Sequence, residues 1–204
     1  MGLNFQSRPT PSNRFWNMGD HMFIQTEATP NPATLKFIPG RRVMPSGTRN
    51  FSAAADADCS PLARALFAVP GVTGVFLGSD FVTATKADDW DWDVLKPQIL
   101  GAIMEHFTAD KPVIVERETA DGADSVEDDE TVTRIKELLD TRVRPAVAQD
   151  GGDITFEGYE EGIVYLYMQG ACAGCPSSTA TLKHGIENML KYYIPEIVEV
   201  RSVN

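Results

Sequence analysis

The hydrophobic pattern over residues 22–108 predicts a small sheet with two helices. Short apolar runs bounded by turn residues are typical of strands, and a serine followed by a proline is typical of a helix start. Ser60-Pro61 therefore begins the first helix, which runs to about residue 69. The second helix lies within 91–107, where Pro97 marks a kink or the true start. Strands are expected at 23–28, 35–38, 72–77 and 81–86. This order favours an antiparallel sheet with helices on one face.

Residues 129–204 carry a second pattern, in which a helical spacing gives way to a hairpin, a helix and a last strand. Apolar residues at 132, 135, 139, 143 and 147 form one helical stripe, which Pro145 disturbs near its end. After the run DGGD at 150–153, strands are expected at 154–159, 163–168 and 197–203, with a helix at 176–192. The predicted fold class is α+β, with two small domains that each pack helices on a mainly antiparallel sheet.

Polar stretches flank the first patterned half. Residues 109–128 begin with a possible short strand at 113–116 and then become acidic, since eight acids and one arginine occupy 116–130. Charge repulsion and the shortage of apolar residues predict a linker here. Residues 1–21 are interpreted as a disordered extension upstream of a start at Met22. A mitochondrial targeting segment is the alternative, because Arg8 and Arg14 occur with no acid before Asp20. The expected domains are therefore an extension (1–21), an N-terminal domain (22–108), an acidic linker (109–128) and a C-terminal domain (129–204).

The overall charge and the cysteine content narrow the class of protein. A net charge of -11 argues against nucleic acid and against anionic membrane as partners, because both attract basic surfaces. The longest apolar runs, such as 163–168, are too short to cross a bilayer. Three cysteines do not form a disulfide framework, so a reducing compartment is expected.

Two cysteines three positions apart, Cys172 and Cys175, are the strongest candidates for chemistry. They lie between the predicted hairpin and the helix that follows it, and Gly170 and Gly174 beside them permit unusual backbone angles. The helix start at Pro176 directs unpaired N–H groups back at the cysteines. The partial positive charge of the helix dipole favours thiolate over thiol and stabilises a bound anion. An anionic iron–sulfur cluster suits this site better than a bare divalent cation does.

Four interpretations of this pair compete. A thioredoxin-like redox pair needs further elements after its helix, and only 29 residues follow Cys175. Half of a structural zinc site needs two more ligands, and no other Cys or His in this domain has ligand spacing. Two small buried packing residues are a common fate of cysteine, but the flanking glycines and helix start speak against it. A cluster shared by two chains completes a four-cysteine set and accounts for the spacing, the count and the dipole together.

Other residues that could suggest a site have simpler interpretations. His184 falls on the polar side of its helix, and His106 ends a helix, where a histidine interacts favourably with the C-terminus. Cys59 is expected to be a small packing residue. Asp150 and Asp153 flank two glycines and are expected to form a turn, since no calcium-loop spacing follows. Without a nucleophile–base pair or a phosphate loop, the sequence does not indicate an enzyme.

Both halves of the chain resemble one protein family. The run DGGDITFEGYEEGIVYLYMQGACAGCPSSTATLKHGIENMLKYYIPEIVEV, with the upstream VRPAV, resembles the C-terminal domain of NifU and of the Nfu proteins. The runs FIQTEATPNPATLKFIPG, SPLARALF, GVTGVFLGSDFVTATK and WDVLKPQIL resemble the Nfu N-terminal domain. The scaffold and ferredoxin-like domains of full-length NifU do not occur, which points to the Nfu type.

The resemblance implies a scaffold or carrier that binds a labile [4Fe-4S] cluster between two subunits. Cys172 and Cys175 of each copy would be the ligands, and only these two residues carry over from the family. The implied partners are a second copy of the chain, upstream cluster-assembly scaffold proteins and the apo iron–sulfur proteins that accept the cluster. The expected location is the cytoplasm, with the mitochondrial matrix as the alternative if residues 1–21 are a targeting remnant.

Overall fold

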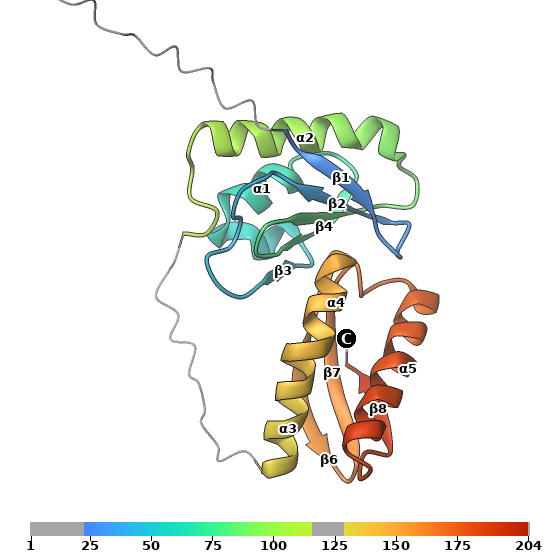
Figure 1. Ribbon diagram of the computed structural model, residues 1–204. Coiled ribbons are helices and arrows are strands. Elements are labelled where there is room, and N and C mark those ends of the chain that lie inside the picture. The colour runs from blue at the N-terminus through green and yellow to red at the C-terminus, as the bar shows by residue number, and fades with distance from the viewer. Residues whose placement is uncertain (1–22, 116–128, 204) are drawn as a thin grey trace, which may run out of the picture.

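A computed structural model describes residues 23–115 and 129–203 of the chain. It contains two sheets, each packed with helices, and the two domains lie one above the other in Figure 1. The sequence prediction of a two-domain α+β protein is confirmed. Within the described ranges, no helix has the length and apolar character needed to cross a membrane. The predicted extension 1–21 and the acidic run 116–128 lie outside the described residues.

The first domain is built on a five-stranded antiparallel sheet. Its strands, in the order β1-β2-β5-β4-β3, are β1 (Gln25–Ala28), β2 (Thr34–Ile38), β3 (Arg49–Phe51), β4 (Val72–Leu77) and β5 (Val82–Lys86). The four predicted strands are confirmed to within two residues at each end. The sequence pattern missed β3, which is only three residues long, and the 3-10 helix η1 (Ala54–Cys59) that follows it.

Two helices cover one face of this sheet, as predicted (Figure 1). The first, α1 (Pro61–Phe67), begins at the expected cap, where the Ser60 hydroxyl accepts a hydrogen bond from the Ala63 N–H at 3.1 Å. The second, α2 (Trp92–Thr108), begins before Pro97, so this proline lies inside the helix. Leucine and isoleucine side chains of both helices pack against inward residues of β4 and β5 and form a single core.

The short strand expected at 113–116 is absent from its described part, residues 113–115. The segment instead lies beside the end of η1 and the start of α1. The Val115 N–H donates to the Cys59 carbonyl at 2.7 Å, and the Ser60 hydroxyl donates to the Val113 carbonyl at 2.7 Å. Two isolated hydrogen bonds therefore hold this segment in place of a strand ladder.

The second domain follows the predicted order α-β-β-α-β. Its elements are α3 (Glu130–Leu138), a π-helical turn η2 (Leu139–Val143), α4 (Arg144–Gln149), β6 (Gly152–Glu160), β7 (Ile163–Gly170), α5 (Pro176–Tyr193) and β8 (Glu199–Ser202). The sheet order is β6-β7-β8. The hairpin β6–β7 is antiparallel, whereas β8 pairs with β7 in parallel because α5 returns the chain to the other end of the sheet.

The helical stripe predicted for the start of this domain forms its core. Ile135, Leu139, Val143 and Val147 are buried in this core, whereas Val132, the first position of the predicted stripe, is only half-buried. The helix widens into the π turn η2 just before Pro145, which has no N–H to donate to the preceding turn. The stripe therefore continues across α3, η2 and α4 as the pattern predicts, with the disturbance close to the proline.

Candidate functional site

The cysteine pair lies in the tight connection between β7 and α5, at the end of the second domain that is nearest the first (Figure 1). Cys175 is the residue immediately before the helix, with extended backbone angles, and Pro176 is the first helical residue. Gly170 and Gly174 have φ angles of 61° and 85°, so both adopt the unusual backbone angles that the sequence analysis said they permit. All three cysteines of the chain are thiols without a disulfide.

Hydrogen bonds from the first turn of α5 fix the backbone on which both cysteines sit. The Thr179 hydroxyl donates to the Cys172 carbonyl at 3.0 Å, and the Thr179 N–H donates to the Cys175 carbonyl at 2.9 Å. The Cys175 sulfur also lies 3.3 Å from the Ser177 hydroxyl oxygen. One threonine therefore ties both cysteines to the helix start, which holds the two sulfurs on one rigid loop.

The glycines of the DGGD run make room for this loop. Gly152, the first residue of β6, is paired with Gly170 at the end of β7. A Cβ at Gly152 would lie 2.5 Å from the Cys172 sulfur and 2.9 Å from the Cys172 nitrogen. Gly151 has a φ of 84°, a conformation that other residues rarely adopt. The sequence analysis interpreted this run only as a turn. It did not predict that the run packs directly against Cys172.

The environment of Cys172 favours the protonated thiol, which corrects the expectation from the helix dipole. The side chain is only 5% exposed and packs with the core of the second domain. Burial, together with the negative charges of Asp150 and Asp153, raises the pKa of Cys172 to about 12. Cys172 lies three residues before the capping position, where core packing outweighs the positive end of the helix. A metal or cluster that binds here must therefore displace a proton from this thiol.

A cavity of about 430 Å³ opens beside Cys172. Cys172 and Asp150 line it from the second domain, with Ser177 and Thr181 of α5 on another side. Pro30, in the loop between β1 and β2 of the first domain, also lines the cavity. The space next to the sulfur is thus bounded by both domains.

The other candidate ligands do not join the pair. Within the described residues, no three His, Cys, Asp or Glu side chains are grouped so that they could hold a metal ion. His184 is exposed, as its place on the polar side of α5 predicts. The Asp153 carboxylate instead accepts two hydrogen bonds from the Arg144 guanidinium, at 2.9 and 2.8 Å. Cys59 is half-buried against the first core, as predicted for a packing residue.

The Asp153–Arg144 pair was not predicted, although the turn at this position was. Burial by itself would raise the pKa of Asp153, but hydrogen bonds from Arg144 and Thr48 and the charge of Arg144 outweigh it and lower that pKa. The Ile154 N–H also donates to this carboxylate at 2.8 Å. Asp153 is therefore a buried, ionised anchor at the start of β6, close to the cysteine loop.

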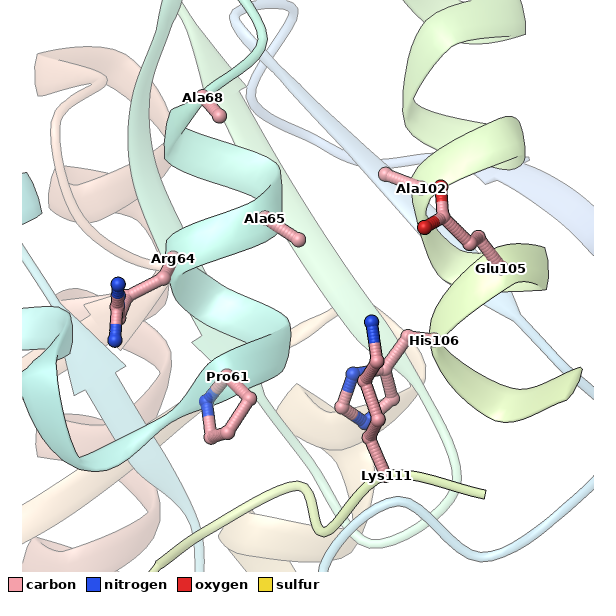
Figure 2. Close-up of a pocket in the computed structure, with 8 residues that line it drawn as sticks. All are labelled: Pro61, Arg64, Ala65, Ala68, Ala102, Glu105, His106 and Lys111. Carbon is pink, nitrogen blue, oxygen red and sulfur yellow. The ribbon is translucent and has the colours of Figure 1, made fainter. Parts of the chain in front are cut away.

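A second cavity, of about 530 Å³, lies between α1 and α2 in the first domain, with Ala65 and Ala102 on opposite sides of it (Figure 2). His106 is buried at its edge, and its Nε2 has no hydrogen-bond partner among the described residues. Desolvation and the charge of Lys111 lower the pKa of His106. The sequence analysis placed His106 at the end of the helix and did not predict its burial. No cysteine lines this cavity.

Comparisons with known proteins agree with the division of the fold. The family model described as scaffold protein Nfu/NifU N terminal matches residues 24–110, and the NifU-like domain matches residues 135–201. The NFU1 iron-sulfur cluster scaffold homolog, mitochondrial, of Homo sapiens is 51% identical over 196 residues, which are 96% of this chain and 77% of that protein.

Two further relatives match a similar share of this chain. NifU-like protein 4, mitochondrial, of Arabidopsis thaliana is 53% identical over 186 residues, which are 89% of this chain and 66% of that protein. The Drosophila virilis NFU1 iron-sulfur cluster scaffold homolog, mitochondrial, is 54% identical over 184 residues, and the match covers 89% of this chain and 62% of that protein. This chain thus spans between 62% and 77% of the length of these three relatives. The chain belongs to the Nfu/NifU-like family of iron–sulfur cluster scaffold proteins.

Proposed function

We propose that the chain is an iron–sulfur cluster carrier in which two copies hold one [4Fe-4S] cluster as cargo. Each copy would supply the sulfurs of Cys172 and Cys175. The observation that supports this most directly is an incomplete donor set: two thiols on one rigid loop, with no third donor grouped beside them in the described part of the chain. Four thiolates complete such a cluster, so a second identical loop is the simplest source of the missing pair.

The chemistry of the loop suits cargo that arrives and leaves. Cluster binding would release the proton of Cys172, whose pKa is raised to about 12, and the core packing around this sulfur would then hold an anion in a poorly solvated place. Burial and the two nearby carboxylates disfavour that anion, so they limit the affinity of the site for the cluster. An acceptor protein that offers less buried thiolates would take the cluster by ligand exchange.

The remaining features of the proposal follow from the family. The acceptors would be apo iron–sulfur proteins, the donors would be upstream scaffold proteins, and the chain would have no catalytic residues of its own. The expectation of a cytoplasmic location has no support from the relatives, whose names place them in mitochondria. We therefore propose the mitochondrial matrix. We also propose that residues 22–108 and 129–204 are the functional domains, joined by 109–128 and preceded by the extension 1–21.

The alternative of a thiol–disulfide oxidoreductase is weakened by the state of Cys172. Such enzymes attack with a thiolate whose pKa is lowered toward neutral pH or below. A buried thiol with a pKa of about 12 is a poor nucleophile without metal.

Anaerobic reconstitution of the full chain with iron and sulfide tests the proposal. A brown protein with about four irons and four sulfides per two chains is expected, as the four-cysteine set requires. Cys172→Ser and Cys175→Ser should each lose the chromophore, while Cys59→Ser serves as the matched control and should keep it. A chromophore that survives either loop substitution, or a wild-type chain that takes up no iron, would contradict the assignment.

A further inference from the structure

One face of the first domain's sheet carries no helix, and yet its side chains are buried. Along β5, Val82 and Ala84 face the helices and belong to the first core, so Thr83 between them faces the other way. Thr83 is nevertheless only 1% exposed, and Phe76 of β4, which also lies outside the helix-packed core, is 1% exposed. The cover comes from the second domain, whose cysteine end rests on this face (Figure 1).

Asn31 makes the contact nearest the cysteines. Its side-chain N–H donates at 2.9 Å to the carbonyl of Ala173, the residue that follows Cys172. The same amide accepts a hydrogen bond from the Ala33 N–H at 3.0 Å, which fixes the rotamer and aims the donor outward. Asn31 is buried, so an unpaired donor here would be unfavourable. Asn31, in the loop between β1 and β2, thus presents a fixed donor to the loop that carries the cysteines.

A lysine on the same face reaches the end of α4. The Lys36 ammonium donates at 2.9 Å to the carbonyl of Gln149, the last residue of that helix. A cation at a helix C-terminus is favourable because the last carbonyls carry partial negative charge. A Glu27 carboxylate oxygen lies 3.2 Å from the same Lys36 ammonium. Lys36 is buried, so its ammonium depends on the Gln149 carbonyl and the Glu27 carboxylate as partners.

Thr83 and Phe76 complete the contact on the glycines beneath the cysteine loop. The Thr83 hydroxyl donates to the Gly151 carbonyl at 2.7 Å. A Cβ at Gly170 would lie 2.9 Å from the Phe76 ring, so this ring rests directly on the glycine. The three polar side chains of the face all donate to main-chain carbonyls, and together they match the backbone shape of the cysteine end of the second domain.

We propose that this face, defined by Asn31, Lys36, Phe76 and Thr83, is a docking site for the chain's own cysteine loop in the cluster-free protein. Docking and cluster sharing compete for the loop. A second copy must bring its own sulfurs within a few ångströms of Cys172 across a common cluster, and Pro30 of the docked domain lines the cavity at that sulfur. The loop therefore leaves the face when two copies pair. This competition rests on the proposed function, whereas the docking itself does not.

The experiment uses the full chain with Asn31→Ala and Thr83→Val combined, which removes the donors to the Ala173 and Gly151 carbonyls. Asn188→Ala with Thr73→Val is the matched control, since both residues are exposed and neither is one of the four residues that define the face. Nitrogen-15 relaxation gives the rotational correlation time of each domain in the apo protein. Each lost hydrogen bond should lower the ratio of docked to undocked molecules about fivefold.

In the wild type and the control, both domains should share one correlation time, and in the double variant they should tumble separately. The double variant should also gain the [4Fe-4S] chromophore at a higher initial rate, about fivefold or more. Separate tumbling in the wild type would overturn the docking. Undocking without a faster gain of cluster would overturn the competition. If no form takes up cluster, the proposed function fails, while the correlation times still decide whether the face is a docking site.

Discussion

Replacement of Gly152 by alanine tests whether the cysteine loop (residues 171–175) depends on the absence of a side chain at Gly152. The added Cβ would lie 2.5 Å from the Cys172 sulfur, 2.6 Å from the Gln169 carbonyl oxygen and 2.9 Å from the Cys172 nitrogen. Two of these three atoms belong to the backbone of β7 and its loop, so no side-chain rotation relieves the contact. Either β6 separates from β7 at this pair or Cys172 moves.

The expected loss follows from two opposing effects. Overpacking in a close-packed site destabilises by about 1–3 kcal/mol, and contact with backbone puts this site at the upper end, about 3 kcal/mol. Alanine also restricts the unfolded chain, which returns up to about 1 kcal/mol because the φ of Gly152 is not left-handed. The net destabilisation is about 2 kcal/mol, which lowers the melting temperature of a domain of this size by about 8–16 °C.

The assay can be specific for the second domain. All five tyrosines of the chain lie between residues 159 and 193, and all three tryptophans lie before residue 93. Tyrosine near-ultraviolet signals therefore follow the second domain, while tryptophan fluorescence follows the first. Gly152→Ala should lower the melting temperature measured by the tyrosine signal. It should also weaken cluster binding, since Cys172 is displaced.

The matched control is Gly185→Ala in the middle of α5. A Cβ there meets no atom within 4 Å outside its own helix. Alanine should stabilise this helix by about 1 kcal/mol, so the control should raise the melting temperature measured by the tyrosine signal. An unchanged transition and unchanged cluster content in Gly152→Ala would refute the steric reasoning.

Two further predictions concern buried polar groups. Asp153→Asn should destabilise the second domain by about 2 kcal/mol at neutral pH, because it removes a charged hydrogen-bond partner of Arg144. Its pKa is lowered in the folded protein, so the carboxylate stabilises above the ordinary value of 3.8 and this stabilisation is lost as the pH falls through the lowered pKa. The difference between wild type and variant, measured by urea unfolding, should therefore shrink below about pH 4. Ser60→Ala should destabilise the first domain by about 2 kcal/mol, read from tryptophan fluorescence. The hydroxyl caps α1 through the Ala63 N–H and also satisfies the Val113 carbonyl.

Exposed residues of the same types serve as controls for these two variants. Asp140 also contacts Arg144 but is largely exposed, so Asp140→Asn should change stability by less than about 1 kcal/mol. Ser52 is exposed, and Ser52→Ala should leave the tryptophan transition in place. A pH-independent gap for Asp153→Asn, or equal effects of the two serine variants, would contradict the assigned roles.

Local patterns predicted most of the fold because each element carries its own signal. The stripe from Ile135 to Val147 and the Ser60 cap are read from neighbouring residues, and both occur as expected. The strand β3 was missed because three residues hold no period. The parallel pairing of β8 was missed because it depends on the path of α5 across the sheet, which spacing along the chain does not encode.

The site was predictable only as far as its ligands are adjacent in sequence. Cys172, Cys175 and their left-handed glycine neighbours form one short motif, which indicates a thiolate site. The role of Gly152 depends on strand register with a residue 18 positions later. Asn31 contacts the loop across a separation of 142 residues, and such a contact between domains leaves no periodic signal. The raised pKa of Cys172 likewise depends on core packing and not on the helix start alone.

Native mass spectrometry of the anaerobically reconstituted chain tests the central claim most directly, because it counts chains and cluster atoms in one particle. The account predicts a species of two chains with one [4Fe-4S] cluster, absent from Cys172→Ser and Cys175→Ser. A cluster held by a single chain, or a dimer whose cluster survives either substitution, would contradict it.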